Sequence, residues 1–334
     1  MSKKSVLLLI PCLILGFASS ALATDKQTPG GPYLGQTPPG DEAVLFAPGI
    51  ISGGFNDRDM AMMPDGSEIY FSVNMRHFEI STILAVYKVN NRWSKPAVAP
   101  FAVESHLKYL EPAISPDGSK FFFVASEHDG KNNNDIWIMN RQADGWGKPA
   151  KLGENINTDV SETFPSITND GTLYFSRASE NPRVEHIYRS RLINGHYTKA
   201  EKLPDNVNSG KSQFNAFVAP DESYLIIPIY GREDSVGSID YYITYRNDND
   251  EWSEPINMGE KINTAGANEY SAYVSRDGKY LFFMSTQLPA KDNVSNEAWS
   301  LEYLSGVHNS PENGNSDIYW IDAGIIEELR PEGY

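Results

Sequence analysis

Cysteine is almost absent from this sequence of 334 residues, and the single one, Cys12, lies in an apolar N-terminal stretch. The rest of the chain therefore has neither a disulfide nor a thiolate nucleophile. Basic residues are also scarce, because 28 Lys and Arg stand against 44 Asp and Glu, for a formal net charge of −16. Nucleic acids and anionic membrane surfaces attract cationic proteins, so this charge argues against both as partners. The expected partner is an unknown protein, or a neutral or cationic small ligand such as a glycan.

Long apolar runs are missing outside the N-terminus, so no membrane span is expected. At the N-terminus, Lys3-Lys4 precedes the apolar residues 5–17, and Ala21-Leu-Ala23 follows as a small-residue cleavage site. This order is typical of a secretory signal peptide, which would cover residues 1–23 and be cleaved after Ala23. The sequence therefore predicts a periplasmic or secreted protein.

Recognised catalytic motifs are missing as well. The chain has no Gly-x-Ser-x-Gly elbow, no His-Glu-x-x-His pair and no phosphate-binding glycine loop. Its six histidines lack the spacing of metal ligands, and each is interpreted as a loop or strand-surface residue. No catalytic residue is predicted, and the sequence names no metal ligand.

What the chain does contain is a repeat. A turn tripeptide begins at residues 64, 116, 169, 220 and 276, so successive copies are 52, 53, 51 and 56 residues apart. A column of aromatic residues keeps the same step: Trp93, Trp146, Tyr197 and Trp252. A period of about fifty residues, filled with strand signals, is typical of a radial array of β-sheets.

Each repeat is predicted to form four short strands. In the second unit, Pro116-Asp-Gly118 is a turn, because proline presets φ and glycine accepts positive φ. The apolar run Phe121–Val124 that follows is short and β-rich, as expected of a strand buried on both faces. Four-stranded sheets repeated around an axis form a β-propeller. The sequence therefore predicts an all-β protein with a single propeller of five four-stranded blades.

The two ends of the chain are expected to complete the last blade. The fifth unit lacks a clear outer strand, and Val44–Pro48 has the pattern of that strand. Pro48 precedes Asp59 by the same eleven residues that separate Pro100 from Glu111. Pairing of the N-terminal strand with the fifth unit would close the ring and leave no exposed edge.

Composition divides the chain into three parts. After the signal peptide, residues 24–42 are rich in Pro, Gly and Thr and predict a flexible leader. Residues 43–334 are then the propeller, which is expected to be a monomer.

Several runs of the second unit resemble the WD-like, TolB-type propeller repeat of exported bacterial proteins. They are, in order, Glu111–Gly118, Asn134–Ile138, Gly145–Pro149 and Leu152–Thr158. The resemblance covers about residues 44–322 and implies the propeller fold. The shared residues occupy turns and packing positions, so they give little information about function. This fold family serves as a binding scaffold, as a partner of envelope proteins and as an accessory domain of peptidases.

Acidic residues gather where the innermost strands begin. Alignment of the units on their turns puts Asp59, Glu111, Phe164, Asn215 and Ser271 in one column, and Asp57, Tyr109, Glu162, Gln213 and Glu269 two positions earlier. Strict alternation would direct both columns to the same side of the strand. Five carboxylates would then meet at one mouth of the channel and raise one another's pKa unless a cation or a donor relieves them.

This acidic rim is the predicted ligand site, with a calcium ion or a hydroxyl-rich molecule as the expected ligand. Its binding residues would be Asp57, Asp59, Tyr109, Glu111, Glu162, Gln213, Asn215 and Glu269. The structural alternative is that the acids accept hydrogen bonds from free amides of the inner strands.

The fifth unit carries an insertion of about residues 287–315 between its second and third strands. Long loops in compact folds are usually functional or disordered. Because this connection follows the second strand, it is expected on the same face as the acidic rim. Its lid candidates are Trp299, Tyr303 and His308.

Two functions remain open from the sequence. The favoured one is a non-enzymatic ligand-binding or protein-interaction module of the cell envelope. The alternative is a glycan-active enzyme of the glycoside hydrolase type, in which rim carboxylates supply one protonated and one ionised group. A catalytic pair would have to lie in an open pocket, without strand amides engaging both carboxylates.

Overall fold

The computed structural model describes residues 29–127, 133–180, 184–289 and 299–334. The predicted signal peptide lies outside these residues. None of the helices in the described part of the chain is both long and apolar enough to cross a membrane.

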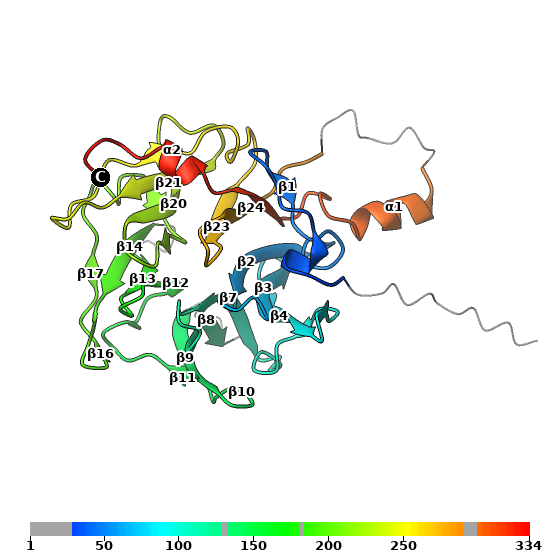
Figure 1. The fold of residues 1–334 in the computed structure, drawn as a ribbon, viewed down its shortest axis with the longest axis horizontal. Helices are drawn as coiled ribbons and strands as arrows, with labels where there is room; N and C mark the ends of the chain where they lie inside the picture. Colours follow the sequence, from blue (N-terminus) through cyan, green and yellow to red (C-terminus); the bar gives the residue numbers. More distant parts are fainter. Residues whose placement is uncertain (1–28, 128–132, 181–183, 290–298) are drawn as a thin grey trace, which may run out of the picture.

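Five antiparallel sheets stand around a common axis like the blades of a propeller (Figure 1). The first three blades follow the order of the chain from the axis outward. Blade one contains β2 (Asn56–Met62), β3 (Glu68–Met75) and β4 (Ile80–Val89), with short outer strands β5 (Arg92–Trp93) and β6 (Ala97–Val98). Blade two contains β7 (Leu107–Ile114), β8 (Lys120–Glu127), β9 (Asp135–Gln142), β10 (Gly145–Trp146) and β11 (Ala150–Lys151). Blade three contains β12 (Glu162–Ile167), β13 (Leu173–Ala178), β14 (Glu185–Ser190) and β17 (Glu201–Lys202), beside a hairpin of β15 (Leu192–Ile193) and β16 (His196–Tyr197).

The last two blades depart slightly from this pattern. In blade four the inner strand is split into β18 (Ser212–Gln213) and β19 (Phe217–Val218), followed by β20 (Tyr224–Tyr230), β21 (Ile239–Tyr245) and β22 (Ile256–Asn257). Blade five contains β23 (Glu269–Val274), β24 (Tyr280–Ser285) and β25 (Asp317–Asp322), and its outer strand is β1 (Val44–Leu45). The predicted five-bladed, four-stranded architecture is therefore confirmed.

The tripeptide turns join the first and second strands of each blade. In blade two, Gly118 has φ +72°, and Asp117 accepts hydrogen bonds from the Ser119 amide at 2.9 Å and the Ser115 hydroxyl at 2.5 Å. The same left-handed position in blade four is taken by Glu222, with φ +63°. A residue with a Cβ can therefore replace glycine in this turn, at a cost in conformational strain.

The repeated tryptophans hold neighbouring blades together. Trp146 of blade two donates its Nε1 hydrogen to the Tyr70 hydroxyl of blade one at 2.9 Å, and its ring lies 5.1 Å from that of Phe121. Trp252 of blade four likewise meets Tyr174 of blade three, with 6.4 Å between the ring centroids. Full burial of one such side chain contributes roughly 1.5–3 kcal/mol, so these columns are a main source of stability for the ring.

The N-terminal strand closes the ring as predicted. In β1, Val44 pairs with Trp320 and Leu45 with Tyr319, and the Phe46 amide donates to the Ile318 carbonyl at 2.8 Å. The Phe46 side chain is fully buried. The outer edge of blade five is thus covered by the other end of the same chain (Figure 1).

The segment before this strand, which belongs to the predicted leader, contacts the ring. From residue 29 onward it packs on the ring, where Trp93 Nε1 donates to the Gly31 carbonyl at 2.9 Å. The 3-10 helix η1 (Tyr33–Gly35) places Tyr33 against Tyr280 and buries Leu34. Backbone hydrogen bonds also join the Trp93 amide to the Pro29 carbonyl and the Asp322 amide to the Gly40 carbonyl, so parts of residues 29–42 contact blades one and five, and the flexibility of residues 24–42 stays a prediction.

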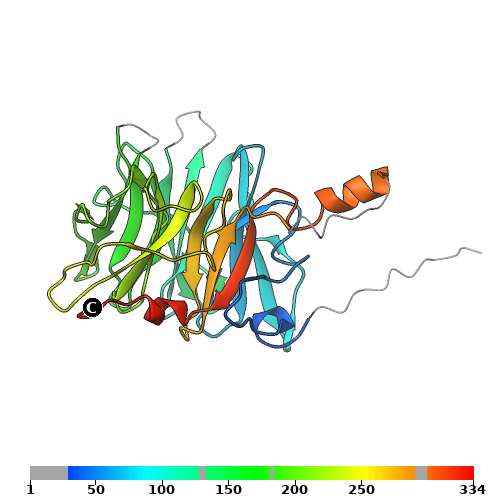
Figure 2. The same cartoon turned by 90° about the horizontal axis from the view of Figure 1, so that it is seen from above.

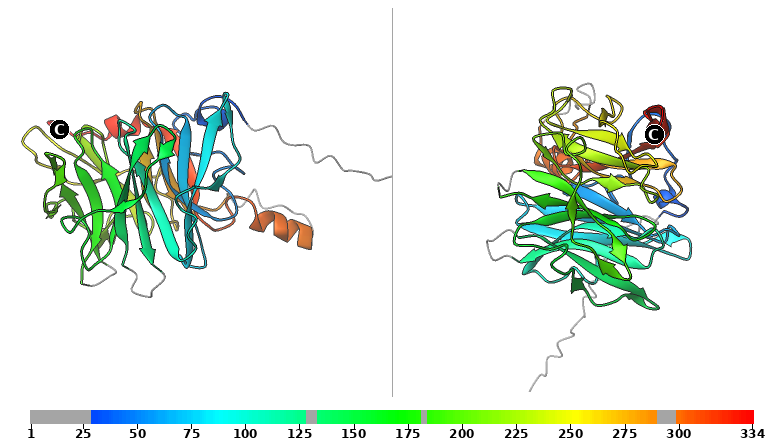
Figure 3. Two further views of the ribbon diagram at one scale, coloured as in Figure 1. Left: turned by 90° about the horizontal axis from the view of Figure 1, so that it is seen from below. Right: turned by 90° about the vertical axis from the view of Figure 1, so that its left-hand side faces the viewer.

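Helices are few and lie outside the sheets. The helix α2 (Ile325–Glu328) and η1 both lie on the face of the ring that carries the tripeptide turns, here called the turn face (Figure 2 and Figure 3). The opposite face, where the inner strands begin, is called the entry face. The helix α1 (Leu301–His308) belongs to the insertion of blade five and projects from the edge of the ring (Figure 1).

Candidate ligand site in the channel

Each inner strand contains one residue with left-handed backbone. These are the five residues of the later predicted column, with φ between +49° and +69°: Asp59, Glu111, Phe164, Asn215 and Ser271. In four blades a bulge or register shift in the pairing with the second strand coincides with this residue. A left-handed non-glycine residue is strained by about 1–3 kcal/mol, and it persists only where the surroundings hold it.

Serines on the second strands hold two of these bulges. The Glu111 amide donates to the Ser72 hydroxyl at 2.9 Å, and the Asn215 amide donates to the Ser176 hydroxyl at 2.8 Å. Each bulge thereby gives an otherwise unpaired N–H group a partner from the preceding blade.

The bulge overturns the alternation argument for the earlier column. Four of its side chains instead accept hydrogen bonds from loop amides: Gly53 to Asp57 at 2.7 Å, Thr158 to Glu162 at 3.0 Å, Gly210 to Gln213 at 3.0 Å and Thr264 to Glu269 at 3.1 Å. The fifth, Tyr109, is buried beside Phe123. This column therefore caps the loops that enter the blades, and its carboxylates do not join those of the later column.

Burial dominates the ionisation of the loop-capping acids. It raises the pKa of Asp57 to about 8, with the Gly53 amide opposing the shift and Asp317 adding to it. Burial also raises the pKa of Glu269 to about 7, and one Glu269 oxygen, Oε2, has no hydrogen-bond partner. These groups are structural acids that hold a proton near neutral pH.

The later column does converge on the axis, around a residue that the sequence analysis missed. The guanidinium of Arg58 contacts both Asp59 oxygens from Nε at 2.8 Å, and its Nη2 lies 3.2 Å from Glu111 Oε1. Ser271 donates its hydroxyl hydrogen to Asp59 and accepts one from Asn215 Nδ2 at 3.1 Å. We call these five residues the channel cluster: Arg58, Asp59, Glu111, Asn215 and Ser271.

The channel cluster is buried and closely paired. Arg58 is 5% exposed, and although burial alone would lower its pKa, the Asp59 carboxylate raises the pKa above the usual arginine range. Burial and the Asp59 carboxylate raise the pKa of Glu111 to about 8, against the opposing effects of Arg58 and the Phe164 amide. The positive charge of Arg58 therefore compensates the carboxyl groups of Asp59 and Glu111, which were expected to bind a cation.

Side chains that are only partly buried adjoin this cluster toward the entry face. The Arg58 guanidinium lies 4.6 Å from the centre of the Tyr270 ring and 5.4 Å from that of Phe78, and Tyr270 meets Phe214 edge to face. Thr163 donates its hydroxyl hydrogen to Glu185 at 3.3 Å, and burial raises the pKa of Glu185. We call these residues the mouth group: Phe78, Thr163, Glu185, Phe214 and Tyr270.

Sequence signals for these missed residues did exist. Arg58 stands directly between two predicted rim acids, and Tyr270 directly follows Glu269. The column between the two predicted columns is the one that supplies Arg58, Thr163, Phe214 and Tyr270. In a regular strand, successive side chains point to opposite faces, so this middle column was expected to point away from the channel. The bulge that reverses its direction leaves no mark on the sequence.

The lid candidates lie away from the axis. Trp299 is 82% exposed, and Tyr303 on α1 pairs with it edge to face at 6.3 Å. His308 ends the same helix, which has no buried residue and extends outward from the ring (Figure 1). The end of the insertion is fixed to blade one, where Asn315 Nδ2 donates to the Gly54 carbonyl at 3.0 Å. In this structure the described part of the insertion does not cover the channel cluster.

The acidic side chains of the rim are not arranged as ligands for the expected calcium ion. Within the described ranges, no group of three His, Cys, Asp or Glu side chains is placed to hold a metal ion. The nearest acids to the axis, Asp59 and Glu111, already share Arg58.

Known proteins that are similar to this chain have low sequence identity with it. No sequence family and no curated protein sequence matches this chain. Among solved structures, TolB from Acinetobacter baumannii is 12% identical with a TM-score of 0.43, over 80% of this chain and 57% of that one. An exo-β-1,3-galactanase from Clostridium thermocellum is 12% identical with a TM-score of 0.48, over 84% of this chain and 62% of that one. Regucalcin, a calcium-binding protein from Agrobacterium tumefaciens, is 12% identical with a TM-score of 0.44, over 84% and 93%.

The chain thus spans little more than half the length of the TolB structure that it matches. The chain is a five-bladed β-propeller whose last blade is completed by its N-terminal strand.

Proposed function

We propose that this protein is a non-enzymatic binding module of the cell envelope that holds a hydroxyl-rich ligand, such as a neutral glycan, at the mouth group. The observation that carries the proposal is the combination of partly buried aromatic rings with two polar groups at the end of the channel. Tyr270 and Phe214 offer ring faces, and Glu185 and Thr163 offer hydrogen-bonding oxygens. Binding sites for small molecules usually combine an apolar, aromatic lining with a few such polar groups.

The channel cluster supports this site from below. Arg58 holds Tyr270 through its ring face and is itself held by Asp59. A ring fixed in this way loses little freedom when a ligand stacks on it, so less binding free energy is spent on ordering the protein. The cluster therefore acts as a rigid floor under the mouth group.

The carboxyl groups of the predicted rim accept hydrogen bonds within the protein, which favours a binding function over catalysis. Glu162 accepts from Thr158 and Arg177, Glu269 from Thr264 and Ser285, and Glu111 from Arg58 and the Phe164 amide. Glycoside hydrolysis needs one free acid and one free carboxylate facing the sugar. The three rim acids named here are buried, and each is engaged through at least one oxygen, so none is free to face a sugar.

One residue outside the predicted rim, Glu185, supports the alternative that the protein is an enzyme. Glu185 is partly buried, and this burial raises its pKa, as hydrolysis requires of a general acid. It lies near enough to Arg58 and Glu111 to affect the ionisation of Glu111. An enzyme would use Glu185 as the acid, and loss of turnover in Glu185→Gln would reveal it.

The proposal is tested by thermal shift with neutral oligosaccharides and with calcium chloride. Wild type is compared with Tyr270→Leu, and Tyr230→Leu is the matched control because Tyr230 is an exposed tyrosine on β20. We expect an oligosaccharide to raise the melting temperature of wild type and of Tyr230→Leu. The Tyr270→Leu variant should bind it about tenfold more weakly, since a ring contact is lost.

Two results would reject the site. The first is the absence of a shift with every sugar, whether or not calcium gives one. The second is an equal loss of affinity in both tyrosine variants, which would place the ligand elsewhere.

A further inference from the structure

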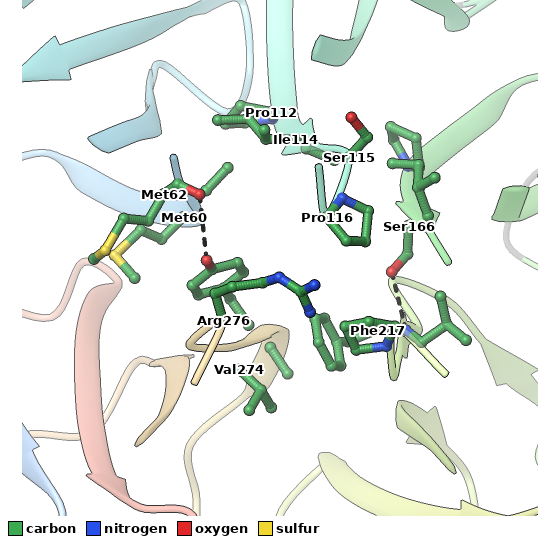
Figure 4. A pocket seen from close by; sticks show the side chains of 18 of the residues that line it. Met60, Met62, Pro112, Ile114, Ser115, Pro116, Ser166, Phe217, Val274 and Arg276 are labelled. Carbon is green, nitrogen blue, oxygen red and sulfur yellow. Dashed lines mark hydrogen bonds between the residues drawn. The ribbon is translucent and has the colours of Figure 1, made fainter. Parts of the chain in front are cut away.

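The half of the channel nearer the turn face is apolar. It contains a cavity of about 70 Å³ lined by residues from the inner strands of all five blades (Figure 4). Its walls include Met60, Pro112, Phe164, Phe217 and Val274. Phe164 is also one of the five bulge residues, so the cavity begins where the polar channel cluster ends.

One cation stands at the open end of this cavity. Arg276 is the first residue of the fifth turn tripeptide, where the other units have proline or asparagine. Its guanidinium reaches toward the middle of the space between the labelled lining residues (Figure 4). The residue is exposed, so its charge faces both the cavity and the solvent.

The carboxylates around Arg276 accept hydrogen bonds from residues of the turns in which they lie. Asp65 accepts from the Ser67 amide at 3.0 Å, and Asp277 accepts from the Ser275 hydroxyl at 2.7 Å. Asp277 also lies 3.5 Å from Lys279 Nζ. Within the described part of the chain, Arg276 makes no ion pair within 4 Å. A guanidinium with five donors is therefore available at the end of an apolar cavity.

A hydroxyl inside the cavity adds a second polar group. Ser166 accepts a hydrogen bond from the Val218 amide at 2.9 Å, which leaves its own hydrogen free to donate. The lining otherwise consists mainly of methionine, proline, alanine, valine, isoleucine and aromatic side chains.

We propose that this cavity binds a small organic anion, with its apolar body inside the ring and its carboxylate on Arg276. The apolar lining favours a hydrocarbon group over a sugar, and an arginine fork matches a carboxylate in two parallel hydrogen bonds. The volume suits a short branched hydrocarbon group that is smaller than an aromatic ring, because an apolar cavity that holds benzene has a volume of about 150 Å³. This site is separate from the mouth group, since the channel cluster and the bulges lie between them.

The site is tested by saturation-transfer NMR titration of the full chain with 4-methylpentanoate and with 4-methylpentan-1-ol. The two probes share their hydrocarbon body and differ in the carboxylate. Wild type should bind the acid about tenfold more tightly than the alcohol, as expected for charge-assisted hydrogen bonds. The Arg276→Gln variant should lose this preference while binding the alcohol unchanged.

Lys279→Gln is the matched control, because it removes a cation from the same turn face and Lys279 already pairs with Asp277. It should keep the full preference for the acid. Equal losses in Arg276→Gln and Lys279→Gln would overturn the site, as would a wild type that binds neither probe. Much tighter binding of N-acetylleucine than of 4-methylpentanoate would also overturn it, because the occupant would then be a peptide C-terminus.

Discussion

A single arginine decides how the acids on the axis behave. Arg58 lies between two aspartates in the sequence, but its guanidinium turns to Asp59, Glu111 and Ser271 and stacks on Tyr270. The acidic rim was expected to need the positive charge of a bound cation. Arg58 supplies a positive charge there from the chain itself. Removal of one partner of a buried ion pair leaves the other charge without compensation.

Replacement of Arg58 by methionine should therefore destabilise the protein by roughly 3–5 kcal/mol near neutral pH. The loss should be larger above about pH 8, where Glu111 is ionised in wild type, than below it, where Glu111 is buried in its neutral form. Urea unfolding at about pH 9 and about pH 6 measures both effects. Arg76→Met is the control, since the Arg76 side chain is 71% exposed and its removal should change little. Equal midpoints for Arg58→Met and wild type at about pH 9 would contradict the role given to Arg58.

The buried acids predict that stability falls as pH rises toward 8. Asp57 and Glu269 have pKa values near 8 and 7 in the folded chain, above their ordinary values. Between about pH 4.5 and 8 the folded protein holds protons that the unfolded chain has lost, so folding is favoured at the acidic end of this window. Asp117 and Asp250 have lowered pKa values, and their opposite effect is confined to pH values below about 4.

The melting temperature of wild type should therefore be higher at about pH 5 than at about pH 8. The variants Asp57→Asn and Glu269→Gln should flatten this slope. A melting temperature that rises with pH over the same window would show that these acids are ionised in the folded protein.

At the scale of elements, repetition made the blades predictable and a bulge hid the site. The turn tripeptides, the aromatic columns and the equal spacing of Pro48 and Pro100 are local in sequence, so they fixed five blades and the closing strand. The left-handed residues are not marked by glycine, and strict alternation therefore assigned the earlier column to the channel together with the later one. The contacts of residues 29–42 with blades one and five are long-range, so the composition of this segment could not indicate them.

The closing strand predicts a measurable loss of stability. A chain that begins at residue 51 should melt at least several degrees below one that begins at residue 29, since it lacks β1, η1 and the buried Phe46. Differential scanning fluorimetry of the two chains is sufficient. Coincident melting curves would mean that the N-terminal strand adds nothing to the ring.

The exposed helix gives a test of the lid hypothesis. Trp299→Ser and Tyr303→Ser should change stability by no more than about 0.5 kcal/mol, because neither side chain packs on the ring. Oligosaccharide affinity should also be unchanged if α1 stays where the structure has it. Weaker binding by these variants would show that the helix moves over the mouth group when a ligand is present.

At the scale of the whole molecule, the ring of bulges divides the axis into two parts of opposite character. On the entry side lie a buried ion cluster and a mouth group of aromatic and polar side chains. On the turn side lies an apolar cavity with one arginine. The sequence could give the net charge of the molecule but not this division, which depends on which side of each inner strand faces the axis.

The central claim, that the mouth group binds a hydroxyl-rich ligand without transforming it, is tested most directly by one NMR experiment. Wild type and Tyr270→Leu are each mixed with a neutral oligosaccharide that shifts the melting temperature of wild type. Saturation transfer to the sugar is recorded at once, and the anomeric proton signals are followed over a day. We predict transfer in wild type, much weaker transfer in Tyr270→Leu and no new anomeric signal in either sample. New anomeric signals that vanish in Glu185→Gln would contradict the account and make the protein an enzyme.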